Sequence, residues 1–391
     1  MGYHMNLNVL IRICGVALLY VLPSVCLASA VVAKPVSNIA AVPSATVPMA
    51  IAERGVFDFD RWDMTLNDIR SRAAAAGVSD AMIKSTMRHA GFIPSIVHSD
   101  KNQSEFKLTM DQYLARTVNQ TRIAEGKKMR AKYPTMLNRV ENRFGVPPHV
   151  ILAFWGMESN YGTVKARHKL TDAFFTLIYE GRRQKFFSNQ LISLMQIADK
   201  NGLDINDIHG SWAGAMGHFQ FIPTTLAQYG VDGNNDGRID IINSIGDAMF
   251  SAGNYLNKLG WNPNERIARR VILPADFDLT LLDGKTKLPL ASWANMGVLN
   301  PDGTPIPVTN MTAGLIADTA AIDAVRAQII ANAATSAPGS IYGDPNAVDT
   351  DVAPRPVITA YLTYPNFYRI KKWNNSNWYA LAIASLSDEL R

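Results

Sequence analysis

The stretch PPHVILAFWGMESNYG, residues 147–162, decides how this 391-residue chain is interpreted. Proline at the start and glycine at the end are the usual boundaries of a helix, so we expect a helix from Pro147 to Tyr161 that stops at Gly162. The positions between are almost all apolar and include a single carboxylic acid, Glu158. This acid falls in the final turn of the predicted helix.

Glu158 shares its helix face with large apolar side chains. They stand three, four and seven positions before it: Trp155, Phe154 and Ile151. If this stripe packs inward, burial disfavours the ionised carboxylate, and the negative end of the helix dipole acts in the same direction. Such an acid keeps its proton at a higher pH than usual, as a general acid for glycosidic bond cleavage requires. A core glutamate satisfied by hydrogen bonds or by an arginine is the alternative.

A second motif, GSWAGAMGHFQFIPTT at residues 210–225, is rich in glycine. Gly214 and Gly217 allow the backbone to approach another group closely, and Gln220 offers both a donor and an acceptor. A short helix is expected to follow from Pro223. The motif fits a loop that lines a ligand site, and it fits a tight structural turn as well.

The third motif, DGNNDGRIDIIN at residues 232–243, has the spacing of an EF-hand calcium loop with glycine at position six. Oxygen-bearing side chains stand at positions one, three, five and nine: Asp232, Asn234, Asp236 and Asp240. At position twelve, Asn243 replaces the usual bidentate glutamate, so we expect weaker binding or a last ligand from Asp247. The motif predicts a structural calcium site, and an Asx-rich turn without metal is the alternative.

Aromatic and amide side chains gather near the C-terminus, in residues 361–379, and Tyr113 and Tyr255 add rings elsewhere. Aromatic faces match the apolar faces of sugar rings, and amides match their hydroxyl groups. Core packing is the default role of any one of these rings. Their density nevertheless predicts that some of them face a sugar.

The N-terminal part of the chain lies outside the expected fold. Residues 1–30 combine Arg12, an apolar run and a small-residue site, which predicts a secretory signal peptide cleaved after Ala30. A membrane anchor, as an uncleaved helix or through a lipidated Cys26, is the alternative. Both cysteines of the chain lie in this segment, so the cleaved protein has no thiol. Residues 31–54, rich in Ala, Pro and Ser, predict a linker.

The composition, 48% hydrophobic and 18% charged, excludes a mostly disordered chain and fits one large domain or two modest ones. The formal net charge of +5 suits an anionic polymer such as a cell wall. Lys and Arg are scattered, however, so an ordinary solvated surface is the simpler explanation.

Helical periodicity dominates the N-terminal third of the chain. The predicted helices are Met64–Ala76, Asp80–His89 after a Ser79 cap, Leu108–Ile123, and Lys127–Phe144 with a break at Pro134. Residues 271–357 are instead dense in turn signals. We expect loops, short strands and one helix near Ile316–Ala334 there.

Taken in order, these motifs resemble the lytic murein transglycosylase B family, from about Phe57 to the C-terminus. The similarity is strongest in GVPP with WGMESNYG, in SWAGAMG with QFIP, and in the calcium-type loop. It implies a catalytic domain of residues 55–391 with a mainly α, α+β fold. A lysozyme-like core, residues 140–262 and 358–391, would carry an N-terminal helical subdomain and a small β and loop-rich insertion at residues 263–357.

The resemblance also implies roles for individual residues. Glu158 would be the catalytic acid/base. The substrate cleft would hold Tyr113, Ser211, Gln220, Tyr255, Asn374 and Tyr379. The calcium ligands would be Asp232, Asn234, Asp236, the carbonyl oxygen of Arg238, and Asp247. The chain departs from the family at Phe219, where glycine is common, and in a calcium loop one residue longer before Asp247.

The implied activity is cleavage of the β-1,4 bond between N-acetylmuramic acid and N-acetylglucosamine, with formation of 1,6-anhydromuramyl ends, in cell-wall turnover. One acid suffices because the substrate supplies the nucleophile, and the chemistry needs no cofactor. A hydrolytic muramidase usually needs a second carboxylate. Asp172 is a candidate, although a helix-capping role fits it as well.

A non-catalytic wall-binding protein is the remaining alternative. With the resemblance, we expect a periplasmic monomer whose partners are peptidoglycan strands and cell-wall synthesis enzymes. Nucleic acid is not an expected partner.

Overall fold

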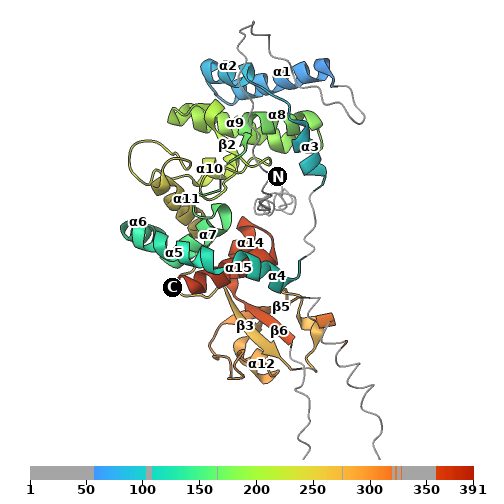
Figure 1. Cartoon of the computed structure of the whole chain (residues 1–391), viewed down its shortest axis with the longest axis vertical. Helices are drawn as coiled ribbons and strands as arrows, with labels where there is room; N and C mark the ends of the chain where they lie inside the picture. The colour runs from blue at the N-terminus through green and yellow to red at the C-terminus, as the bar shows by residue number, and fades with distance from the viewer. Residues whose placement is uncertain are drawn as a thin grey trace, which may run out of the picture.

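The computed structural model describes residues 57–102, 108–164, 166–274, 276–318, 322–323, 327 and 358–391. The predicted signal peptide with its Cys26, and the predicted linker, lie outside these residues. The described part is elongated and mainly helical, with helices at one end and a small sheet at the other (Figure 1). The mainly α, α+β class predicted from the sequence is confirmed.

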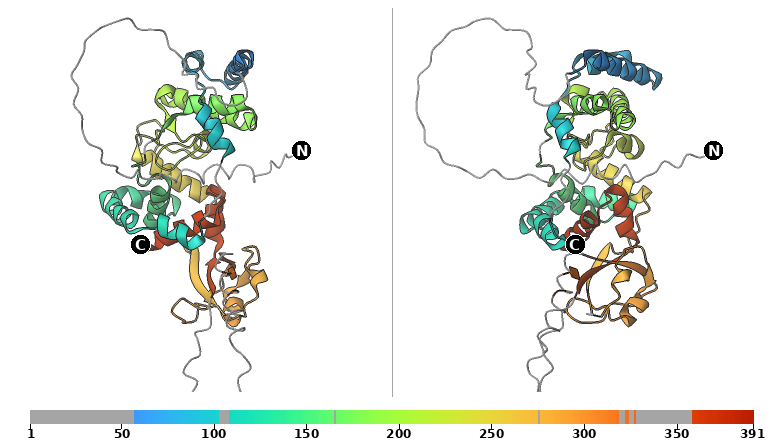
Figure 2. Two further views of the ribbon diagram at one scale, coloured as in Figure 1. Left: turned by 45° about the vertical axis from the view of Figure 1, so that its right-hand side comes forward. Right: turned by 90° about the vertical axis from the view of Figure 1, so that its right-hand side faces the viewer.

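The end of the molecule far from the sheet is a layer of helices (Figures 1 and 2). They are α1 (Phe59–Ala75), α2 (Asp80–Arg88), α3 (Pro94–Lys101), α8 (Leu170–Glu180) and α9 (Gln184–Asn201). Local chemistry sets where the first two begin, because the side chains of Asp58 and Ser79 accept hydrogen bonds from first-turn amides. The rings of Trp62 and Tyr179, 5.8 Å apart, join α1 to α8. The N-terminal helices are thus packed on helices from the middle of the chain.

The central layer is built around one buried helix, α7 (Pro148–Ser159). The other helices of this layer are α4 (Met110–Thr117), α5 (Gln120–Lys132), α6 (Pro134–Phe144), α10 (Pro223–Tyr229), α11 (Ile245–Lys258), α14 (Pro365–Trp373) and α15 (Asn377–Glu389). Every residue of α7 from Val150 to Ser159 is buried, as its nearly uniform apolar composition requires. A two-stranded pair, β1 (His168–Lys169) and β2 (His209–Gly210), ties the upper layer to the loop that follows.

The other end of the molecule is a four-stranded antiparallel sheet in the order β3-β6-β5-β4. Its strands are β3 (Ala268–Leu273), β4 (Leu288–Pro289), β5 (Thr312–Ala317) and β6 (Ile358–Thr363). Helix α12 (Leu290–Asn295) closes a separate apolar cluster there, with the buried Trp293 donating its indole N–H to the Ala313 carbonyl oxygen at 2.9 Å. Strand β6 comes from the C-terminal segment assigned to the core, and the domain boundaries stay predictions.

Most helix predictions are confirmed, including the Ser79 cap and the start of α6 at Pro134, but two are wrong. The single helix predicted for Leu108–Ile123 is divided into α4 and α5, because Asn119 accepts a hydrogen bond from a backbone amide and caps a new start. Ile316 lies in β5, where its apolar side chain is buried against the sheet. The rest of the helix predicted near Ile316–Ala334 lies mostly outside the described residues.

Candidate active site

Glu158 occupies the last turn of α7, as predicted, and the chain reverses immediately after it. The two residues that follow α7 take left-handed backbone conformations, with φ of 48° and 59°, so the helix ends two residues earlier than expected. The second of them, Tyr161, donates a hydrogen bond from its hydroxyl to the Arg122 carbonyl oxygen at 3.0 Å. A Cβ on Gly126 or Gly156 would collide with that hydroxyl, which explains why glycine interrupts both α5 and α7.

The carboxyl group of Glu158 is buried, with 4% of the residue exposed. One of its oxygens, Oε1, accepts two hydrogen bonds. The Trp373 indole N–H donates at 3.0 Å and the Tyr379 hydroxyl at 2.5 Å. The donors come from α14 and α15, more than 200 positions further along the chain. The C-terminal helices therefore complete the surroundings of this acid.

Burial raises the pKa of Glu158 from its ordinary 4.5 to about 8, while the hydrogen bonds from Tyr379 and Trp373 act in the opposite direction. The charged form loses hydration in an apolar pocket, and two donors return only part of it. Glu158 therefore keeps its proton at neutral pH. The expectation from its helix face is borne out by this geometry.

A wall of aromatic rings surrounds Trp373. Its ring centroid lies 4.8 Å from that of Phe154, 4.8 Å from that of Tyr255 and 5.4 Å from that of Phe221. Tyr255 also stacks on Tyr229, with centroids 4.5 Å apart. The indole that donates to Glu158 is held in place on several sides.

Tyr113 of α4 belongs to the same region. Burial, and then the charge of Glu158, raise the pKa of Tyr113 to about 12, and the nearby Arg122 acts in the opposite direction. Its ring lies 5.7 Å from that of Trp378 at the start of α15. Tyr113, Tyr255 and Tyr379 thus converge on Glu158 from three different helices.

The glycine-rich loop at residues 210–225 is fastened to the end of α7. His218 accepts a hydrogen bond at Nδ1 from the Trp155 indole at 3.1 Å, and its carbonyl oxygen accepts one from the Ser159 hydroxyl at 2.7 Å. Phe219, the departure from the family pattern, is fully buried and stacks on Trp155 at 6.5 Å. The loop is therefore a fixed wall next to Glu158.

Both alternatives for that loop find support within it. A Cβ on Gly214 would collide with Phe174 and one on Gly217 with the Ile241 carbonyl oxygen, so both glycines serve tight packing. Gln220 takes a left-handed conformation, with φ of 50°, and its side chain donates to Gly217 at 3.0 Å.

Two of the predicted cleft residues lie in this loop, and neither has a hydrogen bond to Glu158 among those described. The Ser211 hydroxyl accepts the Ala215 amide at 3.0 Å. Gln220 directly precedes Phe221, which packs on Trp373 and on Tyr255, and Asn374 is buried next to Trp373 in the chain. The structure thus brings these three to the edge of the site.

Two residues of the site escaped the sequence analysis. Trp373 was noted only as one aromatic residue among many, and His218 was not noted at all. Their partners, Glu158 and Trp155, are distant in the sequence, so no local pattern reveals them.

The calcium-type loop meets the expected donor set only in its first half. Asp232, Asn234 and Asp236 face one another across the turn, and both Asp232 oxygens accept backbone amides. The Asp247 carboxylate is turned inward instead: it is fully buried and accepts amides of Gly233, Asn234 and Asp240 at 2.8–3.3 Å. Among the described residues no group of three or more His, Cys, Asp or Glu is arranged to hold a metal ion.

Asp172 does not act as a partner of Glu158 in this arrangement. It lies in the first turn of α8, and its side chain accepts a hydrogen bond from the Gly91 amide at 3.0 Å. Burial raises its pKa, and the bond to Gly91 opposes that rise. Its observed contact joins α8 to the segment between α2 and α3.

Within the described part of the chain, none of the helices has the length and apolar character needed to cross a bilayer.

Comparison with known proteins gives a consistent result. The transglycosylase SLT domain family matches residues 61–388. The membrane-bound lytic murein transglycosylase B of Escherichia coli (strain K12) is 36% identical over 138 residues, which is 35% of this chain and 38% of that protein. The curated relative is therefore matched over less than half of its own length.

Solved structures extend the likeness to most of the fold. SltB3 from Pseudomonas aeruginosa, solved in complex with NAG-NAM-pentapeptide, has a TM-score of 0.71 at 32% identity and covers 84% of this chain and 79% of its own. Escherichia coli Slt35, solved in complex with calcium, has a TM-score of 0.64 at 24% identity and covers 84% and 92%. The predicted fold class is thereby confirmed.

Proposed function

The chain belongs to the transglycosylase SLT domain family, as its motifs indicated, and on this premise we propose that it is a peptidoglycan lytic transglycosylase. It cleaves the β-1,4 bond between N-acetylmuramic acid and N-acetylglucosamine and leaves 1,6-anhydromuramyl ends. The SltB3 complex with NAG-NAM-pentapeptide supports this substrate class.

One observation carries the proposal: Glu158 is a buried carboxylic acid whose pKa is raised to about 8. A glycosidic oxygen leaves only if it is protonated as the bond breaks, and an acid that holds its proton at neutral pH supplies it. A core glutamate of purely structural function would be expected to have an arginine partner. Here the partners of Glu158 are two neutral donors.

The hydrogen bonds indicate which oxygen carries the proton. Trp373 and Tyr379 both donate to Oε1, so in the neutral acid Oε1 is the acceptor and the proton resides on Oε2. Oε2 then donates it to the glycosidic oxygen. The charge left on the carboxylate is met at Oε1 by the same two donors, which is how they lower the pKa of Glu158.

The rest of the reaction falls to the substrate. The groups that shift the pKa of Glu158, namely Tyr379 and Trp373, include no second carboxylate. The muramyl acetamido group, or an oxocarbenium-like state, carries the positive charge at C1. Glu158, now ionised, removes the proton of the C6 hydroxyl as that oxygen closes on C1. Because this attack is intramolecular, correct positioning supplies much of the rate.

Six residues are proposed to hold the glycan: Tyr113, Ser211, Gln220, Tyr255, Asn374 and Tyr379. The rings of Tyr113 and Tyr255 suit apolar sugar faces, and the amides of Gln220 and Asn374 suit hydroxyl and acetamido groups. Their support is proximity to Glu158, either directly or through Trp373. Tyr379 serves twice, because it also holds the acid.

A structural calcium ion is proposed for the loop after Val231. Asp232, Asn234, Asp236 and the carbonyl oxygen of Arg238 would hold it, as the EF-hand spacing suggests. Asp247, whose oxygens already accept three backbone amides, would complete the site only through its remaining acceptor capacity. The ion would supply rigidity to the loop and take no part in proton transfer.

We further propose that the protein acts in the periplasm as a monomer, exported by a signal peptide in residues 1–30. A lipid anchor through Cys26 is the alternative. Peptidoglycan strands are its substrate, and cell-wall synthesis enzymes are proposed partners.

Mass spectrometry of purified sacculi digested with the protein tests this function. The expected products end in 1,6-anhydromuramic acid, one water lighter than the reducing ends that a hydrolytic muramidase leaves. Reducing ends alone would show hydrolysis, and the absence of released muropeptides would show a binding protein. Either result would contradict the proposal.

A further inference from the structure

The face of α15 turned away from Glu158 borders two adjoining cavities of about 330 and 220 Å³, which share Ala268, Ala384 and Asp388 in their walls. Asp388 follows Tyr379 by nine positions, two and a half helical turns, so the two side chains project from opposite faces of α15. Together the cavities reach the size range of small-ligand sites. They are separate from the candidate active site.

The smaller cavity lies at the start of α7 and offers hydrogen-bond donors. No side chain among the described residues caps this helix start, which carries the positive end of the helix dipole. Trp261 lines the cavity and is more than nine-tenths buried, yet its indole N–H has no acceptor in the described part of the chain. A buried donor without a partner is costly, so an acceptor from a ligand is expected there.

The charged groups around this cavity leave room for an anion. Burial and the cations Arg391 and Arg130 lower the pKa of His149 to about 4, so its ring is neutral and has an N–H to donate. The two acids in the wall are already paired: Glu265 with Arg369, and Asp388 with both Arg266 and Arg391. A small carboxylate is therefore not opposed by a free negative charge.

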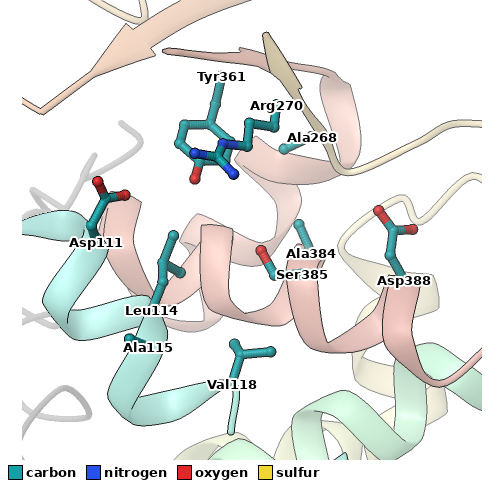
Figure 3. Close-up of a pocket in the computed structure, with 10 residues that line it drawn as sticks. All are labelled: Asp111, Leu114, Ala115, Val118, Ala268, Arg270, Tyr361, Ala384, Ser385 and Asp388. Carbon is teal, nitrogen blue, oxygen red and sulfur yellow. The ribbon is translucent and has the colours of Figure 1, made fainter. Parts of the chain in front are cut away.

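The larger cavity has a different character. Asp111 stands at one end and Asp388 at the other, with an apolar floor that includes Leu114 and Val118 between them (Figure 3). Arg270 lies beside Tyr361, its partner across the β3–β6 pair, on the opposite wall. Asp111 has no ion pair among the described residues and is available to an amino group.

We propose that the two cavities form one binding site for a short peptide, whose terminal carboxylate lies at Trp261, His149 and the start of α7. Its amino group lies toward Asp111, and its apolar part crosses the floor between them. A peptide combines these three features, whereas a sugar or an inorganic anion lacks the amino group. Identifying this peptide with a stem peptide of peptidoglycan rests on the proposed function; the binding itself does not.

Isothermal titration of the full chain with the dipeptide Lys-Ala and with its C-terminal amide tests the site. The free carboxylate is expected to bind at least tenfold more tightly than the amide, as a hydrogen bond to a charged group predicts. Trp261→Phe removes the donor and should reduce affinity for Lys-Ala about tenfold while leaving the affinity for the amide unchanged.

Trp62→Phe is the matched control, since it makes the same change in α1, far from the cavities. Arg391→Ala, at an exposed position, tests the same carboxylate without risk to the fold and should also weaken Lys-Ala binding. Equal binding of the two peptides, absence of binding, or Trp261→Phe equal to wild type would overturn the inference. Lytic activity is assayed in parallel, so that loss of peptide binding with activity retained counts against this site alone.

Discussion

Two buried carboxylic acids, Glu158 and Asp247, show how differently this fold uses the same chemical group. Glu158 is 4% exposed and Asp247 is fully buried. Glu158 has two side-chain donors on one oxygen, whereas Asp247 has three backbone amides distributed over both. Burial alone therefore does not identify a catalytic acid. The number and kind of donors decide whether the group keeps its proton or holds a loop together.

The two acids also differ in where their partners come from. The donors to Asp247 lie within 14 positions of it, in one loop. The donors to Glu158 lie 215 and 221 positions away, on α14 and α15. The first environment is local and belongs to the loop itself. The second exists only when the C-terminal helices are packed against α7.

The largest expected effect comes from Glu158→Gln. The amide keeps the shape of the side chain but has no acidic proton, so the rate of muropeptide release should fall by about 10²–10⁴-fold, the usual contribution of a general acid. Release from sacculi followed by chromatography measures it. Activity within about tenfold of wild type would remove Glu158 from its proposed role.

The same variant should be more stable than wild type at neutral pH. The pKa of Glu158 is about 8 in the folded protein against an ordinary 4.5, so the native state binds this proton more tightly than the unfolded chain does. Its contribution to stability is full below about pH 4.5 and is lost as pH rises toward 8. Urea unfolding of both proteins at pH 5 and pH 8 should show the advantage of Glu158→Gln growing with pH.

Asp247→Asn is the matching change in the other acid, and its effect should fall on stability. The new NH₂ group faces a backbone N–H that previously donated to the carboxylate, and the loss is about 2–3 kcal/mol. Urea unfolding at neutral pH measures it. Muropeptide release per folded molecule should stay near the wild-type rate, and a loss like that of Glu158→Gln would erase the distinction between the two acids.

Trp373→Phe and Tyr379→Phe alter only the donors to Glu158. Each hydrogen bond lowers the pKa of Glu158, with Tyr379 the stronger, so removing either should raise that pKa. Because the acid must be protonated, the alkaline limb of the pH–rate profile should move to higher pH in both variants, and further in Tyr379→Phe. The size of the shift is about one pH unit per donor, since a unit corresponds to about 1.4 kcal/mol.

Trp293→Phe serves as the control for the tryptophan change. It removes a buried indole donor that binds the Ala313 carbonyl oxygen in the sheet. The protein should lose stability while its pH–rate profile stays in place. A similar shift in Trp293→Phe would mean that the limb reports general destabilisation.

The smallest expected effect concerns calcium in the loop that contains Asp247. At a concentration about tenfold above its dissociation constant, the ion should stabilise the fold by about 1–2 kcal/mol. Thermal unfolding with calcium and with a chelator measures this, and Asp236→Asn should abolish the difference. An unchanged melting temperature would favour the Asx-rich turn without metal.

The sequence revealed what local patterns can encode. The helix of Glu158 was predicted from its prolines and glycine, and the acid's burial from the rings three and four positions before it. The calcium-type loop was readable from its spacing. The division of α4 from α5 at Asn119 was missed because a lone cap in a polar helix is weak evidence against continuous periodicity.

The donors to Glu158 were harder to predict. Tyr379 was expected in the cleft only through the family resemblance, and Trp373 was not singled out, because their contact with Glu158 joins distant segments. Ile316 was assigned to a helix because a short apolar run fits either structure. Its burial in β5 depends on β6, about forty positions later.

The central claim is that Glu158 holds its proton at neutral pH, and a direct titration of this carboxyl tests it. Infrared difference spectra between wild type and Glu158→Gln, recorded across a pH series, isolate its protonated form. The account predicts that this signal persists through pH 7 and disappears with a midpoint of about 8. A midpoint near the ordinary value of 4.5 would contradict it.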